Sequence, residues 1–350
     1  MKKVLIAMCA MAAVMACTKT EATFEQPGEI SFSPVSRYNT KAAVAPADGI
    51  GGQNVYMFAN TMADKKYFEN ALFVPETGVE YNDLQVYQGN PAQFWPNATN
   101  LKFAGYTESG NVGTDANEVT ASMTTWGTMT IEGYSQPYNF SNEQNNDLMW
   151  FFDAGTDGSD ADTDPDGYGK STAYVTPTMK HACSWIEFKV KVDADLVSYW
   201  NNITVKNIKF ETLNTTGTVA LSTTAAWESV SGQKTDVNIY DNATGTVVDA
   251  TAKTIDSAVA NNVIVVPQLT TTLAMTYSYT TPAGVSVTET KTGISLKYDV
   301  DNEWAPGTHY TYELTIGADE IKIAPASAPW TDYDADDSED GVQNPTQEVK

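Results

Sequence analysis

The chain has 350 residues, of which 44 are acidic and 20 basic, and its formal net charge is −24 at neutral pH. That charge repels polyanions, so nucleic acid is excluded as a partner and an anionic membrane surface is disfavoured. Hydrophobic residues form 42% of the chain, which is enough to build folded cores, and the length is typical of about two domains. Arg37 is the only arginine in the chain.

The first residues have the pattern of an export signal. Lys2 and Lys3 precede an apolar run over residues 4–16 that is too short to span a bilayer, and small residues lead into Cys17. We therefore predict a lipoprotein signal peptide over residues 1–16, with Cys17 acylated and the protein anchored by lipid. An ordinary signal peptide cleaved nearby is the alternative. Removal of the signal and acylation of Cys17 would leave Cys183 as the one free thiol, so we expect no intrachain disulfide.

The body of the chain is dominated by apolar residues that recur at every second position, which predicts β-strands. The alternating segments, in chain order, are residues 55–57, 101–103, 129–131, 186–192, 273–279, 294–300 and 310–316. The alternating apolar residues stand at odd positions up to Val205 and at even positions from Ile208 onward, which predicts a β-bulge near residues 206–207. Only residues 67–73 and 252–260 offer short helices. Many short strands separated by turn residues predict an all-β protein built of β-sandwiches.

A polar stretch rich in Gly, Asp, Ser and Thr runs from residue 153 to 170, and Pro177 precedes a strongly alternating strand. We therefore predict one sandwich over residues 38–176 and a second over 177–330. The last segment, residues 331–350, is acidic and polar and is expected to be a tail.

Candidate catalytic and metal-binding groups are few. His181 and Cys183 share a strand face, but a nucleophile pair also needs an orienting partner and a pocket, so a core thiol beside a sheet histidine is the favoured interpretation. Asp162, Asp164 and Asp166 precede Gly167 as in the first half of an EF-type calcium loop, although the acidic residue required at position 12 is absent. A solvated loop is favoured over weak calcium binding. No other cofactor and no enzyme activity are predicted.

Several segments together resemble the fimbrillin family, the pilins of Gram-negative anaerobes. They are, in chain order, the signal ending at Cys17, residues 36–42 (SRYNTKA), 93–96 (QFWP), 101–106 (LKFAGY), 147–150 (DLMW), 181–188 (HACSWIEF) and 304–314 (WAPGTHYTYEL). Each motif alone is weak, but their order and their spread over residues 1–330 are specific.

The resemblance implies two tandem transthyretin-like β-sandwich domains and export to the outer membrane as a lipoprotein. It also implies that an Arg-specific protease cuts after Arg37, which makes Tyr38 the new N-terminus and removes residues 17–37. The removed piece contains Ile30 and Phe32, which alternate as a groove-filling strand should. A strand from another fimbrial subunit would then fill the open groove by β-augmentation and build a surface fimbrium that supports adhesion.

The donor strand and the role of this subunit stay open at the level of sequence. The acidic tail after Trp330 is a poor donor, because buried unpaired carboxylates are costly. The donor strand is then the region of Ile321–Ile323. Alternatively, this subunit accepts a strand from a neighbour and donates none. Two alternatives remain: an uncut, lipid-anchored basal subunit, and a lipid-anchored glycan binder that uses Trp126, Tyr134 and Tyr138.

Overall fold

The computed structural model describes residues 28–36, 53–81, 84–97, 99–107, 120–136, 147–153, 167–169, 174–255, 263–297 and 303–329. Nearly all regular structure in these ranges is β-strand, which confirms the all-β prediction. One short helix, α2 (Ala194–Val197), is present there, and the Asp193 side chain caps it by accepting a hydrogen bond from the backbone N–H of Asp195.

The first sheet has eight strands, and both of its ends are formed by one short piece of chain. In spatial order the strands are β1 (Ser31–Phe32), β5 (Leu84–Gly89), β4 (Lys66–Tyr81), β3 (Val55–Thr61), β6 (Leu101–Thr107), β9 (Met149–Asp153), β10 (Thr178–His181) and β2 (Val35–Ser36). Because β1 and β2 are consecutive, residues 28–36 connect the two ends of the sheet. The sheet thereby closes around a core that contains Ile30 and Phe32.

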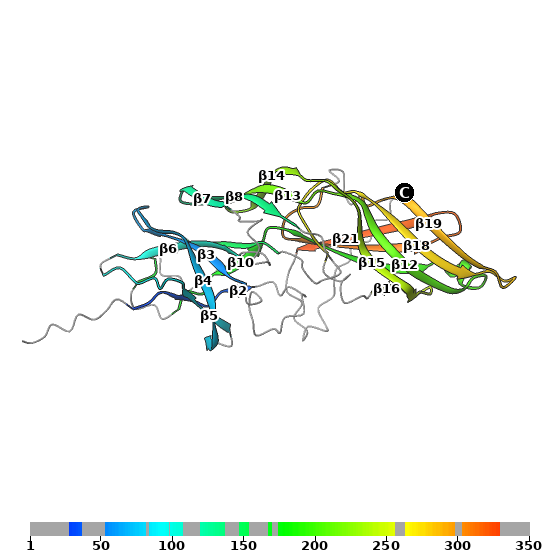
Figure 1. The fold of residues 1–350 in the computed structure, drawn as a ribbon, viewed down its shortest axis with the longest axis horizontal. Coiled ribbons are helices and arrows are strands. Elements are labelled where there is room, and N and C mark those ends of the chain that lie inside the picture. Colours follow the sequence, from blue (N-terminus) through cyan, green and yellow to red (C-terminus); the bar gives the residue numbers. More distant parts are fainter. Residues whose placement is uncertain are drawn as a thin grey trace, which may run out of the picture.

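A second sheet of four strands covers the outer face of the first (Figure 1). Its strands, in order, are β14 (Ala225–Ser231), β13 (Thr216–Leu221), β8 (Thr128–Ser135) and β7 (Thr120–Thr125). The β13–β14 hairpin comes from the second half of the chain, yet β13 pairs antiparallel with β8, with Val219 opposite Ile131. The two halves on either side of residue 177 therefore share a sheet, while the domain limits themselves stay a prediction.

The β6 strand shows the consequence of two covered faces. All seven of its residues are buried. Phe103 belongs to the core inside the closed sheet, whereas Ala104 and Tyr106 belong to a second core shared with β8 and β13. Both faces of β6 therefore lie in a core.

The second half of the chain forms a sandwich of two sheets at the other end of the long axis (Figure 1). One sheet contains β16 (Lys253–Thr254), β11 (Ser184–Val192), β20 (Thr308–Ile316) and β21 (Ile321–Pro329), with β17 (Val263–Val265) also paired to β11. The facing sheet contains β15 (Lys234–Val247), β12 (Asn201–Leu213), β18 (Thr272–Thr280) and β19 (Ser286–Ser295). Strict alternation of buried and half-buried residues along β11 matches the predicted strand at 186–192.

Two local expectations have opposite outcomes. The bulge is confirmed, since the β12–β15 register shifts between Val205 and Asn207. The helix expected at residues 67–73 is wrong, because that segment lies in β4 and pairs with β3 on one side. The helix expected at residues 252–260 is contradicted at Lys253–Thr254, which form β16, and residues 256–262 lie outside the described ranges.

Candidate assembly groove

Residues 28–36 supply two short strands, β1 and β2, that join the two ends of the first sheet. The predicted groove-filling residues point into its core: Ile30 is 0% exposed and Phe32 is 1% exposed. Ser33, which lies next along the chain, is also fully buried. Because side chains alternate across a strand, Ile30 and Phe32 share one face.

Hydrogen bonds hold this segment along both of its edges. On one edge it runs antiparallel to β5 and to the residues after it: the Ile30 N–H donates to the Gln93 carbonyl at 2.8 Å, and Phe32 lies opposite Tyr87. On the other edge it runs parallel to residues 175–179. There the Ser33 N–H donates to the Val175 carbonyl at 2.8 Å. Removal of the segment would leave two unpaired strand edges facing one another.

The side chain of Phe32 fits between two aromatic rings. Phe73 from β4 and Phe103 from β6 contact it edge to face, with ring centroids 4.9 and 5.0 Å away and interplanar angles of 87° and 90°. Such T-shaped pairs contribute about 0.5–1.5 kcal/mol each beyond the burial of apolar area. We call the pair Phe73 and Phe103 the aromatic socket.

The C-terminal strand β21 has the opposite environment. Among the described strands it lies at the edge of its sheet and pairs with β20 alone, from Ile321 opposite Ile316 to Pro329 opposite Thr308. None of its side chains is fully buried, and Ile321 and Ile323 are only partly covered by the second-half core. Within the described residues, this strand is therefore held by a full ladder with β20 along one edge.

The other residues predicted to act in processing or in calcium binding lie outside the described ranges: Cys17, Arg37, Tyr38, Asp162, Asp164 and Asp166. Within the described ranges, no group of three or more His, Cys, Asp or Glu side chains is placed to hold a metal ion. The same part of the chain contains no helix long and apolar enough to cross a membrane.

The His181 and Cys183 side chains contact different partners inside the protein. His181 Nδ1 lies 2.6 Å from Asp147 Oδ2, with both residues buried. Cys183 Sγ lies 3.3 Å from the Tyr134 hydroxyl and is fully buried. Burial, with the Asp147 charge as a further cause, raises the pKa of the Cys183 thiol to about 12. With this raised pKa the thiol is protonated at neutral pH. It is therefore not a nucleophile, because only the thiolate is nucleophilic.

Of the three aromatic residues considered for glycan stacking, Tyr138 lies outside the described ranges. Tyr134 is 0% exposed and packs edge to face on Trp227, so it cannot stack on a sugar. Trp126 is half-buried, with Phe152 against it and the Lys102 ammonium 4.6 Å from the ring centroid. These contacts make Trp126 and Tyr134 parts of the folded structure.

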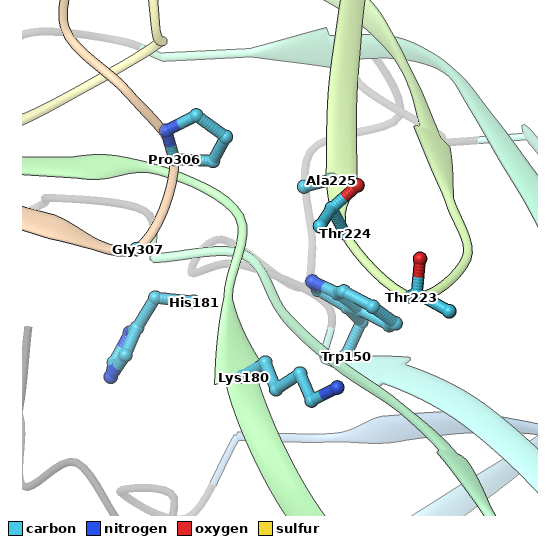
Figure 2. Close-up of a pocket in the computed structure, with 8 residues that line it drawn as sticks. All are labelled: Trp150, Lys180, His181, Thr223, Thr224, Ala225, Pro306 and Gly307. Atoms are coloured by element: carbon cyan, nitrogen blue, oxygen red, sulfur yellow. The ribbon is translucent and has the colours of Figure 1, made fainter. Parts of the chain in front are cut away.

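A pocket of about 430 Å³ lies where the two halves meet, between the start of β9, the end of β10, the turn of the β13–β14 hairpin and the loop before β20. Figure 2 shows Lys180 running alongside Trp150, whereas the ring of His181 points away from them. The Lys180 ammonium lies 5.1 Å from the centroid of the Trp150 ring. Apart from His181, no residue predicted to carry function lines this pocket.

Sequence reasoning identified the strand but missed the residues that receive it. Phe103 lies in a predicted strand, but nothing in the sequence pairs it with Phe73 or Phe32. Gln93 lies in the motif at residues 93–96, but nothing in the sequence indicates that its carbonyl and that of Val175 accept hydrogen bonds from Ile30 and Ser33.

Comparison with known proteins shows which family this chain belongs to. A family model described as fimbrillin-like matches residues 40–330, most of the chain. A fimbrial protein from Bacteroides vulgatus has a similar structure, with a TM-score of 0.55, 18% identity and coverage of 87% of this chain and 100% of that one. The tip fimbrial protein Mfa3 from Porphyromonas gingivalis matches with a TM-score of 0.36, 7% identity and coverage of 86% and 98%, which is too distant to carry an argument. A search among curated proteins found no match. The match to the family model shows that the chain belongs to the fimbrillin-like family of fimbrial proteins.

Proposed function

We propose that this protein is a subunit of cell-surface fimbriae that is made as an outer-membrane lipoprotein, cut after Arg37 and assembled by strand exchange. In this scheme Cys17 carries the lipid, and the cut releases both the lipid and the strand at residues 28–36. Another subunit then supplies a replacement strand, and its backbone re-forms the lost ladder.

The observation that supports this proposal is the position of residues 28–36 in the first sheet. They are hydrogen-bonded on both edges and supply two buried side chains to the core, Ile30 and Phe32. The strand's last described residue, Ser36, directly precedes the single arginine of the chain. A cut there would detach an interior strand without touching the rest of the sheet, and an open sheet edge binds any strand of matching pattern.

The uncut form has a role of its own in this scheme. A subunit that keeps residues 1–37 retains its lipid and a filled groove, so it can anchor a fimbrium but cannot accept a strand. Cleavage at Arg37 therefore separates the two roles.

The test is to determine the N-terminus of the chain sheared from the surface of cells that produce it. A start at Tyr38 supports a cut and polymerised subunit. Lipid-modified Cys17 as the sole N-terminus would rule out that role and leave the anchor or the glycan binder. The matched variant Arg37→Ala removes the only arginine, and surface polymers that form normally from it would disprove the cut.

A further inference from the structure

The pocket at the junction of the two halves is lined by hydrogen-bond donors that the proposed assembly does not use. Trp150 on β9 lies directly opposite Lys180 on β10, so the two side chains share one face of the sheet. The Lys180 ammonium lies 5.1 Å from the centroid of the Trp150 ring. Thr223 and Thr224, in the turn of the β13–β14 hairpin, add two hydroxyl groups to the wall of the pocket.

The indole N–H of Trp150 is a buried donor without an acceptor. Trp150 is 1% exposed, and among the described residues its Nε1 atom has no hydrogen-bond partner. Such a group has lost its hydrogen bond with water and has gained none in return, which is unfavourable. Figure 2 shows this nitrogen on the side of the ring that is turned toward Thr224 and Gly307. An acceptor on a ligand in the pocket would satisfy it.

The charge of the pocket is opposite to that of the chain. None of the eight described residues that line it is acidic, although the chain has 44 acidic residues. The Asp147 carboxylate is bound to His181 Nδ1, and the His181 ring points away from Lys180 (Figure 2). More distant carboxylates are largely screened, because the Debye length is about 8 Å at physiological ionic strength. A cation among neutral donors fits an anionic oxygen ligand.

Hydrogen bonds hold the walls of the pocket in place. The Trp227 indole N–H donates to the Ala182 carbonyl at 2.6 Å and fixes the β13–β14 hairpin. The Gly307 N–H donates to the Cys183 carbonyl at 2.8 Å and fixes the loop before β20. Both acceptors directly follow β10, the strand that carries Lys180. The site is therefore formed before a ligand arrives, which lowers the cost of ordering on binding.

The size and the remaining walls of the pocket suit a sugar ring. Its volume of about 430 Å³ falls within the range of about 300–1,000 Å³ that is typical of small-molecule sites. Ala225 and Pro306 give it apolar surface, against which the C–H face of a pyranose can pack. The hydroxyls of Thr223 and Thr224 can both donate and accept, so they match sugar hydroxyls.

We propose that this pocket binds an acidic sugar, a pyranose that carries a carboxylate, as hexuronic and sialic acids do. The carboxylate accepts hydrogen bonds from the Lys180 ammonium and the Trp150 indole N–H, and the sugar hydroxyls pair with Thr223 and Thr224. The site uses none of the three aromatic residues that the sequence suggested for glycan stacking. It is present in the uncut chain, so the inference does not rest on cleavage or strand exchange.

The first test is an NMR titration of the isotope-labelled, uncut, full-length chain with D-glucuronate and, separately, with N-acetylneuraminate. The chain has eight tryptophans, and the indole N–H signal that disappears in Trp150→Phe belongs to Trp150. We expect this signal to move on addition of either acid and to saturate at roughly millimolar concentrations. D-Glucose, which has a hydroxymethyl group in place of the glucuronate carboxylate, is the neutral control. Acetate is the control for a bare anion.

Variants of exposed residues then locate the site by calorimetry. Lys180→Met removes the ammonium but keeps an unbranched side chain, and it should weaken glucuronate binding about tenfold or more. Thr224→Val removes one hydroxyl and should weaken binding to a smaller extent. Lys322→Met, at an exposed lysine on β21 outside the pocket, is the matched control and should leave the affinity unchanged. Because Lys180 and Thr224 are exposed, both variants should fold, and they decide the question without Trp150→Phe.

Binding of either acidic sugar that is weakened by Lys180→Met and not by Lys322→Met supports the proposal. Absence of binding by both acids, or affinity that Lys180→Met leaves unchanged, overturns it. Equal affinity for D-glucose would show that the carboxylate plays no part, and equal affinity for acetate would show a general anion site. Either of these results also overturns the assignment to an acidic sugar. All measurements use the uncut chain, so a failure here leaves the proposed cleavage and strand exchange standing.

Discussion

A disulfide that locks the resident strand in place is the most direct test of strand exchange. Ser31 lies opposite Gln88 across the β1–β5 pair, so Ser31→Cys with Gln88→Cys should form a bond of ordinary geometry. The bond closes a loop of about 57 residues, and in the chain-entropy model it should stabilise the uncut protein by about 4 kcal/mol. Cys183 is fully buried and does not compete for the new thiols.

After the cut at Arg37, the locked fragment stays attached to the groove. We expect normal cleavage in the locked form, but no uptake of a labelled strand peptide and no polymer, and both of these should return when the bond is reduced. Denaturant unfolding of the oxidised and reduced forms measures the stabilisation. The control lock is Thr276→Cys with Thr290→Cys, which bridges β18 and β19 and leaves the groove open. Polymers that form at the normal rate while mass spectrometry shows the Ser31–Gln88 lock intact would refute the groove as the assembly site.

Three further predictions concern the folded chain. Burial raises the pKa of the Cys183 thiol to about 12, so iodoacetamide at pH 8 should leave it unmodified until urea unfolds the protein. Trp304→Phe removes the indole N–H that donates to the Tyr312 hydroxyl at 2.8 Å in the second-half core, which should lower the free energy of unfolding by about 1–3 kcal/mol in a denaturant titration. An added Cβ at Gly105 would lie 2.6 Å from a neighbouring sulfur, so Gly105→Ala should cost about 1–3 kcal/mol in the same assay. Gly28→Ala, whose nearest neighbour is 3.8 Å away, should cost less.

The alternating pattern is clearest in strands with one face in a core and the other partly exposed. In β11 and β20 the alternation is complete, so the period of two is visible without any knowledge of the partners. The segment at residues 67–73 failed because its apolar spacing suits a helix as well as a strand. What decides the matter is pairing with β3 and β5, and such pairing is set by distant residues rather than by local preference.

The predicted boundary at residue 177 illustrates a different limit of the sequence. A polar stretch between residues 153 and 170 signals a break in the strand pattern, but it carries no information about which sheet a later hairpin joins. The β13–β14 hairpin packs Val219 and Leu221 against Met129 and Ile131, on the far side of that break in the sequence. The groove shows the same limit, because Ile30 and Phe32 predict a strand but cannot reveal that Val175 lies beside it.

The tether on residues 28–36 gives a physical reason why the proposed assembly would wait for the protease. In the uncut chain this segment is tethered to its own groove at an effective concentration that is roughly millimolar, and its Phe32 ring fills the aromatic socket. A strand from another subunit would have to displace it from solution. In the proposed scheme the cut at Arg37 removes the tether, so the resident strand becomes a separate ligand that would be lost by dilution, and an incoming strand could then take its place.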